Sequence, residues 1–248
     1  MTKREVIGRY RGSMMGILWS FFNPVLMLSV YTFVFSVVFK ARWNGTSASK
    51  SEFAIVLFAG MIVYSLFAET INRAPTLIIS NVNYVKKVVF PLEILPLVAL
   101  GSTLFHTAVS TLVWMLFYLV IHGSLQWTSL LFPLVLLPLV MFTLGLSWFL
   151  ASIGVYLRDV AQTVSVFTTI MMFLSPVFFS ITSVPEDFRP FMNANPLTFI
   201  IEQGREVLIW GRLPDWPRFA LSIFVGMIVA WLGFAWFQKT RKGFSDVL

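Results

Sequence analysis

The sequence predicts an all-α integral membrane protein. Of its 248 residues, 58% are hydrophobic and only 12% are charged, and several continuous apolar runs reach the roughly 20 residues that a helix needs to cross a bilayer. A membrane β-barrel is excluded, because its strands would appear as alternating segments of about ten residues. Backbone groups in lipid must therefore be satisfied within each helix. The whole chain, residues 1–248, is expected to form one transmembrane domain.

Six transmembrane helices are expected, at residues 21–39, 53–71, 95–121, 129–153, 161–181 and 218–237. The distribution of Lys and Arg favours one orientation, because cytoplasmic loops of membrane proteins are enriched in these residues. Most of the 18 basic residues lie before the first span, between the second and third spans, at Arg158, and after the sixth span. Both termini are therefore predicted to be cytoplasmic.

An amphipathic helix is expected at residues 1–17, lying on the membrane surface rather than crossing it. Its apolar positions recur at helical spacing opposite basic side chains, and they are Val6, Tyr10, Met14 and Ile17. We interpret this segment as an interface helix that leads into the first span.

Residues 181–216 are too polar to span the bilayer and too apolar to form a simple loop. Pro185 and Pro196 stand where short helices could begin. The apolar face of the second helix would consist of Leu197, Ile200, Ile201, Gly204 and Leu208. The polar residues expected to point away from it are Glu202, Arg205 and Glu206. A helix of about 15 residues is only about 22 Å long, so we predict short re-entrant helices on the periplasmic face.

Three ionisable residues fall within or beside the apolar runs, where an unpaired charge costs several kcal/mol. They are Glu69, Glu93 and His106. The two carboxylates lie close to predicted cytoplasmic ends, and we expect them to form structural ion pairs. The basic residues near them in the sequence are Arg73, Lys86 and Lys87. His106 is expected to be neutral and bonded to a Ser or Thr of a neighbouring helix.

Motifs for catalysis are missing from the sequence. It has no phosphate-binding loop, no nucleophile elbow and no zinc-protease motif, and it contains no cysteine and two histidines. The chain is therefore not expected to be an enzyme, to hydrolyse ATP, or to bind a metal or cofactor. The net charge of +7 is attributed to topology rather than to nucleic-acid binding.

The segment Asn81–Pro96, with the sequence NVNYVKKVVFPLEILP, resembles a signature of permease subunits of ABC exporters that move lipid-linked polysaccharides. These exporters carry O-antigen, capsule or teichoic-acid chains. Three further segments resemble the same family in the same order: RYRGSMMGILWSFFNP at Arg9–Pro24, VYLRDV at Val155–Val160 and KTRKGFSDVL at Lys239–Leu248. The resemblance covers essentially the whole chain.

This resemblance implies a homodimer in the bacterial inner membrane, docked on two copies of a separate nucleotide-binding ATPase subunit. That subunit would use ATP and Mg²⁺. A lipid-linked polysaccharide would pass through a channel between the two copies, in contact with membrane lipids. Overall similarity, rather than a diagnostic residue, favours O-antigen as the exported glycan.

The segment 81–90 is predicted to be a cytoplasmic coupling helix that contacts the ATPase. Lys86 and Lys87 would supply a basic contact, Phe90 an apolar plug, and Pro91 would stop the helix. The full set of predicted coupling residues, including a second contact in the turn after the fourth span, is Asn81, Tyr84, Lys86, Lys87, Phe90, Pro91, Arg158 and Asp159.

Aromatic side chains are predicted to line the glycan path, because flat rings contact sugar C–H faces without a fixed hydrogen-bond pattern. In the first span Tyr31, Phe35 and Phe39 lie four residues apart, on one helical face. The fifth span contributes Phe173, Phe178 and Phe179. The alternative interpretation is that these rings face lipid or neighbouring helices.

Two other functions stay open from the residues alone. A membrane-embedded sugar-lipid transferase would need clustered Asp, His or Lys at the cytoplasmic surface, and Asp159 alone gives little support. A secondary transporter would need intramembrane carboxylates or broken helices in matching halves. The residues that hint at broken helices are Pro133, Pro138 and Pro176.

Overall fold

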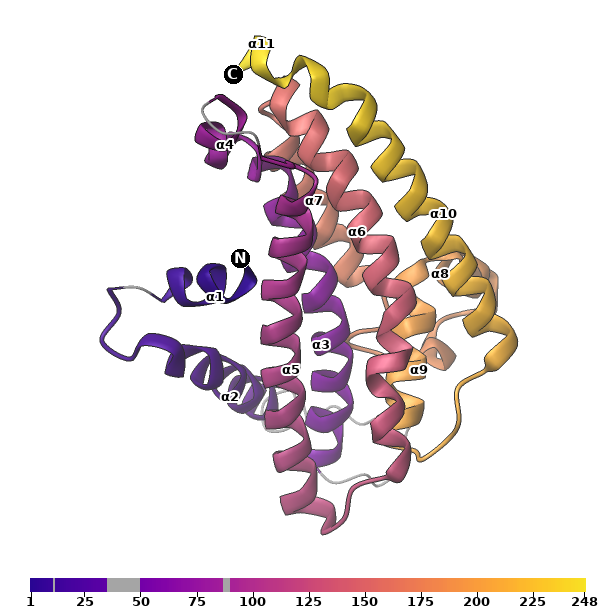
Figure 1. Ribbon diagram of the computed structural model, residues 1–248. Helices are drawn as coiled ribbons and strands as arrows, with labels where there is room; N and C mark the ends of the chain where they lie inside the picture. The colour runs from indigo at the N-terminus through magenta and orange to yellow at the C-terminus, as the bar shows by residue number, and fades with distance from the viewer. Residues whose placement is uncertain (11, 35–49, 87–89) are drawn as a thin grey trace.

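The computed structural model describes residues 1–10, 12–34, 50–86 and 90–248. Every regular element within these ranges is a helix. The main helices are α2 (Trp19–Tyr31), α3 (Lys50–Arg73), α5 (Ile94–His122), α6 (Phe132–Tyr156) and α10 (Trp216–Thr240). Helices α3, α5 and α6 run along the length of the molecule, α2 lies at an angle to them, and α2 and α10 lie on opposite sides of the bundle (Figure 1). The predicted all-α membrane fold is confirmed.

Among the described residues, five helical segments are long and apolar enough to cross a membrane. They are Gly16–Val34, Glu52–Thr76, Ile94–His122, Trp127–Tyr156 and Trp216–Val247. The predicted span at 161–181 is instead α7 (Val160–Phe173), of 14 residues, which rises only about 21 Å. Pro176, which has no N–H to donate, follows in a buried turn and prevents the helix from continuing. In the part of the chain that the structure describes, six full-length spans are therefore not observed.

The core is built around α3. Of its candidate membrane-spanning window, 78% is buried, against 11% for the first span and 17% for the last. Trp114 of α5 is fully buried and donates from Nε1 to the carbonyl of Ile55 at 2.9 Å. Residues of α6 and α9 (Pro196–Leu208), among them Phe132 and Ile201, close the same cluster. The outer helices therefore present most of their apolar surface to lipid or to a partner.

Helices α6 and α10 touch through glycines. A Cβ atom on Gly233 would overlap the carbonyl oxygen of Gly145, and one on Gly226 would lie 2.8 Å from the carbonyl oxygen of Pro138. Small residues of this kind allow membrane helices to approach backbone to backbone. The last span is thereby fixed against α6 rather than against the central α3.

The N-terminal helix is shorter than predicted. Helix α1 covers Thr2–Arg9, and the chain then turns before η1 (Gly16–Leu18) leads into α2. Gly12 and Gly16 have φ angles of 86° and 52°, a left-handed conformation that a continuous helix does not contain. Of the predicted apolar face, Val6 is buried, whereas Met14, beyond the break, is fully exposed.

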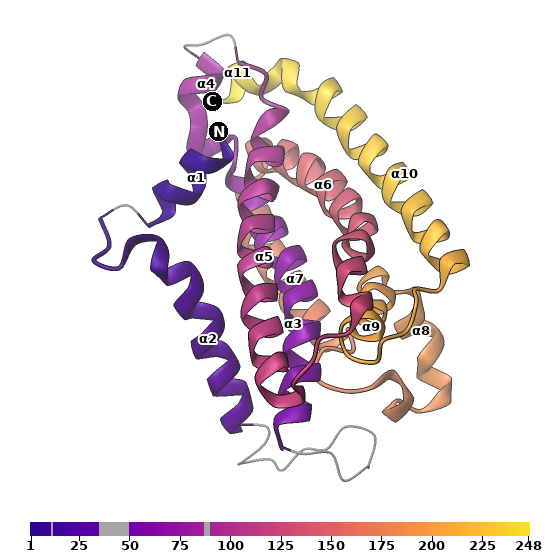
Figure 2. The same cartoon turned by 60° about the horizontal axis from the view of Figure 1, so that its bottom comes forward.

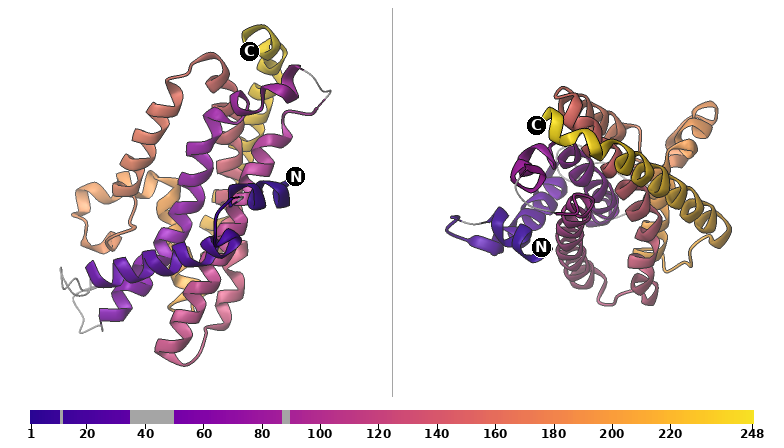
Figure 3. Two further views of the ribbon diagram at one scale, coloured as in Figure 1. Left: turned by 90° about the vertical axis from the view of Figure 1, so that its left-hand side faces the viewer. Right: turned by 45° about the horizontal axis from the view of Figure 1, so that its top comes forward.

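The segment before α10 consists of short helices, as predicted. It contains η6 (Ile181–Ser183), η7 (Glu186–Phe188), α8 (Arg189–Ala194) and α9. Pro196 is the first residue of α9, and the Asn195 side chain caps it by accepting from the Leu197 N–H at 3.0 Å. The predicted apolar face of α9 is buried. Helix α8 projects from the side of the bundle (Figures 2 and 3).

The two ends of the bundle carry different elements. One end carries α4 (Val82–Lys86), η8 (Arg241–Gly243) and α11 (Phe244–Val247), while the α5–α6 connection lies at the other (Figure 1). The predicted coupling segment and the C-terminal residues therefore share one end.

Candidate functional site

A hydrophobic cluster lies beneath α4. Its buried members are Ile78, Leu95, Trp148, Ala151, Val155, Phe237 and Phe244. The rings of Tyr84 and Phe90 pack against it and stack on each other, with centroids 4.7 Å apart and planes inclined by 25°. The structure thus brings these two predicted coupling residues together. Phe90 is half-buried against its own chain, so its predicted role as a plug for a partner stays a prediction.

The junction between α4 and α5 is bonded to η8 and to α6. Glu93 forms an ion pair with Arg241, with 3.0 Å between Oε2 and Nη1. Trp148 of α6 donates from Nε1 to the Glu93 carbonyl at 3.0 Å. The predicted ion pair of Glu93 is therefore confirmed, and among the described residues its partner is Arg241.

Asn81 and Pro91 bracket the coupling segment. The Asn81 amide donates to the carbonyl of Leu77 at 2.8 Å, which closes the end of η4 (Ile79–Asn81). Pro91 is exposed, and its carbonyl accepts from the Ile94 N–H at 3.1 Å, which begins the turn into α5. Both residues shape the backbone on either side of α4.

The second predicted contact, Arg158 and Asp159, is exposed in the turn between α6 and α7. The Asp159 carbonyl accepts from the Thr163 N–H at 3.1 Å and so begins α7. The predicted basic contact lies outside the described residues, which exclude Lys87 and the side chain of Lys86.

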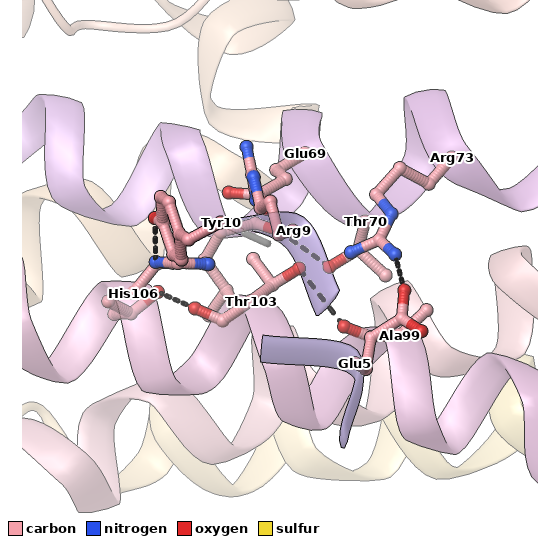
Figure 4. A network of polar contacts seen from close by, with 11 residues as sticks. Glu5, Arg9, Tyr10, Glu69, Thr70, Arg73, Ala99, Thr103 and His106 are labelled. Atoms are coloured by element: carbon pink, nitrogen blue, oxygen red, sulfur yellow. Dashed lines mark hydrogen bonds and ion pairs between the residues drawn. The ribbon is translucent and has the colours of Figure 1, made fainter. Parts of the chain in front are cut away.

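Two ion pairs attach α1 to α3 (Figure 4). Arg9 pairs with Glu69, and Glu5 pairs with Arg73. The predicted ion pair of Glu69 is confirmed, but the partner comes from α1 rather than from the nearby Arg73. Helix α1 packs against α5, and this brings Arg9 to the Glu69 carboxylate.

His106 of α5 contacts Tyr10 rather than the predicted Ser or Thr. The Tyr10 hydroxyl lies 3.4 Å from His106 Nδ1, and the two rings meet edge to face (Figure 4). Burial raises the pKa of Tyr10, which keeps the phenol protonated. This contact and the two ion pairs form one polar network between α1 and the bundle.

A cavity of 320 Å³ opens beside this network, between α2, α3 and α5. Tyr31, at the end of α2, lines it together with Asn23 and His106. Tyr31 therefore faces the bundle of its own chain. Phe35 and Phe39, predicted on the same face, lie outside the described residues.

The aromatic residues after α7 lie close together. Phe173 is exposed at the end of the helix, and its ring centroid lies 6.1 Å from that of half-buried Phe178. Phe178 and Tyr31 pack against the same cluster at the start of α3. Phe179 is also half-buried. The structure thus brings together two predicted channel residues, Tyr31 of the first predicted span and Phe178 of the fifth, at the start of α3.

Arg205 of α9 is fully buried, contrary to the prediction that it points away from the apolar face. Its Nη1 and Nη2 donate to the carbonyls of Pro176 and Val177 at 2.7 and 2.8 Å. Its Nε donates to the carbonyl of Val56 at 3.1 Å, and Glu202 accepts from Nη1 at 2.9 Å. One guanidinium therefore connects α9, the turn after α7, and α3.

Residues 1–209, more than half of the chain, match the family described as ABC-2 type transporter. The chain belongs to this family. The relationship predicted from the four motifs is thereby confirmed. An ABC-2 chain is a transport component rather than an enzyme, and its family works with an ATPase subunit.

Relatives of this ABC-2 chain match it from end to end. It is 27% identical over 250 residues to the O-antigen export system permease protein RfbA of Klebsiella pneumoniae, covering 100% of this chain and 93% of that protein. It is 29% identical over 249 residues to the RfbA protein of Myxococcus xanthus, covering 99% and 93%. It is 23% identical over 247 residues to the polysialic acid transport protein KpsM of Escherichia coli, covering 96% and 91%.

Arg205 is the feature of this ABC-2 chain that sequence reasoning missed. A signal was present, because Leu197, Ile201 and Arg205 lie four residues apart on one face of α9. Burial lowers the pKa of Arg205 to about 10, with Glu202 opposing the shift, so the guanidinium stays charged at neutral pH. Burial also raises the pKa of Glu202, and the positive charge of Arg205 counteracts this.

Proposed function

We propose that this chain is the transmembrane subunit of an ATP-driven exporter of lipid-linked polysaccharide in the bacterial inner membrane. The observation that carries the proposal is end-to-end similarity to O-antigen export permeases, which covers 100% of this chain in the Klebsiella relative. The whole chain would act as one transmembrane domain. It would bind no cofactor itself, and the ATPase subunit would bind ATP and Mg²⁺.

The arrangement of one end of the bundle supports coupling to an ATPase. Helix α4 is followed in the chain by α5, and it packs on the cluster that includes Trp148 of α6. The exposed turn with Arg158 and Asp159 directly follows α6. Movement of a bound ATPase subunit at this end would therefore be transmitted to α5 and α6. In the proposal this end is cytoplasmic, as are both termini, and the short helices α8 and α9 are periplasmic.

The outer helices support a channel between two copies of the chain. Only 11% of the first candidate span is buried within one chain, and Phe173 of α7 is 62% exposed. In the proposal these surfaces face a second copy, the glycan and membrane lipids. The path would be lined by Tyr31, Phe35, Phe39, Phe173, Phe178 and Phe179.

The glycan we propose is O-antigen. Identity is 27% and 29% to the two O-antigen permeases but 23% to the polysialic acid transport protein. All three alignments cover at least 96% of this chain, so the difference does not come from partial matches.

Cells that lack this chain provide the test. We expect lipid-linked O-antigen to accumulate inside such cells and to disappear from their surface, with capsule unchanged, and a restored gene to reverse both effects. Unchanged surface O-antigen would overturn the proposed glycan. Loss of the intracellular lipid-linked glycan itself would instead indicate a sugar-lipid transferase.

A further inference from the structure

The C-terminal segment Arg241–Leu248 turns back towards α4 instead of extending α10 (Figure 1). Phe244 is fully buried, and its ring centroid lies 5.6 Å from that of Phe237 at an interplanar angle of 78°. Leu248, one helical turn later, packs against the same cluster. The segment is therefore anchored by its apolar side chains.

The same cluster holds the coupling segment. Helix α4 has only five residues, and a helix this short is not stable without tertiary contacts. Its contacts are supplied through Tyr84 and Val85, which pack on the cluster that contains Phe244, as does Phe90 beyond the helix. The position of α4 therefore depends on the C-terminal segment.

A polar contact acts on the junction behind α4. Arg241 Nη1 lies 3.1 and 3.0 Å from the two carboxylate oxygens of Glu93, and Gln238 Nε2 lies 3.5 Å from one of them. Glu93 directly precedes α5. Arg241 therefore restrains the point at which movement of α4 would enter α5.

The outward faces of the two segments lie at the same end of the molecule. On the C-terminal segment Lys242, Asp246 and Val247 are exposed, and on α4 Asn83 is exposed. Because α11 contacts α4, these side chains belong to one surface. A protein that docks on α4 would meet α11 at the same time.

We propose that α4 and α11 form one docking surface for the ATPase subunit, in which Arg241 is a positioning residue that acts through Glu93. The proposal rests on the proposed function and extends it by assigning a role to the C-terminal segment. It treats Phe244 as the anchor and Lys242, Asp246 and Val247 as the surface presented to the partner.

Charge reversal tests the positioning role in the full-length chain expressed with its ATPase subunit. We expect Arg241→Glu and Glu93→Arg each to reduce export per ATP hydrolysed by about fivefold, the size of a partly exposed ion pair. The double variant should return to within about twofold of the parent, because the pair is restored with opposite polarity. Lys239→Glu is the matched control, since Lys239 is exposed and makes no ion pair among the described residues.

Val247→Asp tests docking separately, because Val247 is 51% exposed and lies outside the cluster. We expect weaker copurification of the ATPase subunit with an unchanged unfolding temperature. Normal copurification with Val247→Asp, or a double charge reversal that is no better than the single ones, would overturn the proposal.

Reversal of Lys86 and Lys87 distinguishes this failure from that of the proposed function. If those reversals weaken the complex and the Arg241 and Val247 variants do not, only the role of the C-terminal segment is wrong. If neither the lysine reversals nor the Arg241 and Val247 variants affect the complex, the ATPase subunit does not dock on the predicted coupling segment.

Discussion

The guanidinium group of Arg205 occupies the space next to Gly60 that a side chain would fill. A Cβ atom on Gly60 of α3 would lie 2.7 Å from Nη2 of Arg205. The absence of a side chain at Gly60 allows the buried cation to reach the carbonyls of Val56, Pro176 and Val177. The short helix α9 is thereby locked onto the central span.

Gly60→Ala should destabilise the protein by about 2 kcal/mol, the cost of losing a buried hydrogen bond to a charged group. Unfolding in detergent measures this, and Gly8→Ala is the control because Gly8 has open space around it. In an Arg205→Met background the same substitution should cost much less, since the guanidinium is gone. Equal costs in both backgrounds would show that Arg205 is not the group displaced.

Gly233→Ala should cost more than Gly226→Ala. The added Cβ at Gly233 would overlap a backbone carbonyl of α6, which cannot move aside as a side chain can, whereas at Gly226 the nearest atom is 2.8 Å away. We expect about 3 kcal/mol for Gly233→Ala, at the upper end for overpacking, and about 1 kcal/mol for Gly226→Ala. Thermal unfolding of the two variants gives the order, and a reversed order would contradict the observed packing of α10.

Single cysteines test the proposed orientation, because the chain contains no natural cysteine. Asp187→Cys in η7 and Lys242→Cys in η8 are both at exposed positions and belong to the two segments proposed on opposite faces. A membrane-impermeant thiol reagent should label Asp187→Cys in intact cells and Lys242→Cys only after the cells are opened. The reverse pattern would show an inverted topology.

Aromatic-to-leucine substitutions test the proposed glycan path. Tyr31→Leu and Phe173→Leu keep apolar bulk but remove the flat ring, so export should fall while ATPase activity and assembly persist. Phe35→Leu and Phe39→Leu are included because the four-residue spacing in the sequence predicts both rings on the same helical face as Tyr31. Phe224→Leu on α10 is the control, because it is also exposed but lies on the opposite side from α2. Unchanged surface glycan in the variants of Tyr31, Phe35, Phe39 and Phe173 would contradict the channel role and indicate that these rings face lipid or neighbouring helices.

Reversal of the adjacent lysines tests the coupling segment. Lys86→Glu combined with Lys87→Glu should weaken copurification of the ATPase subunit, because two attractive charges become repulsive. The effect should diminish at high salt if the contact is exposed. Normal copurification and normal export in this variant would assign coupling to another segment.

Local patterns predicted most of the helices, since the length of an apolar run and its period are properties of adjacent residues, but they extended the fifth predicted span beyond the end of α7 at Phe173. The buried face of α9 and the start of that helix at Pro196 follow from such patterns. The end of α1 was missed, because the left-handed conformations of Gly12 and Gly16 let the chain turn between α1, which packs on α5, and α2.

Partners distant in sequence were not predictable in the same way. Glu69 and Glu93 were expected to be paired, but their partners lie 60 and 148 residues away, at Arg9 and Arg241. Arg205 bonds a carbonyl 149 residues away, at Val56. Burial of a charge is tolerated only when such acceptors converge on it, and only the tertiary structure shows that convergence.

Transport into inside-out membrane vesicles tests the central claim most directly. Vesicles that contain this chain and its ATPase subunit would receive lipid-linked O-antigen on their outer, originally cytoplasmic, surface. The measured quantity is the fraction of glycan protected from a glycan-degrading enzyme. ATP-driven export predicts protection that requires ATP hydrolysis and this chain. Equal protection without ATP, or in vesicles that lack the chain, would contradict the account.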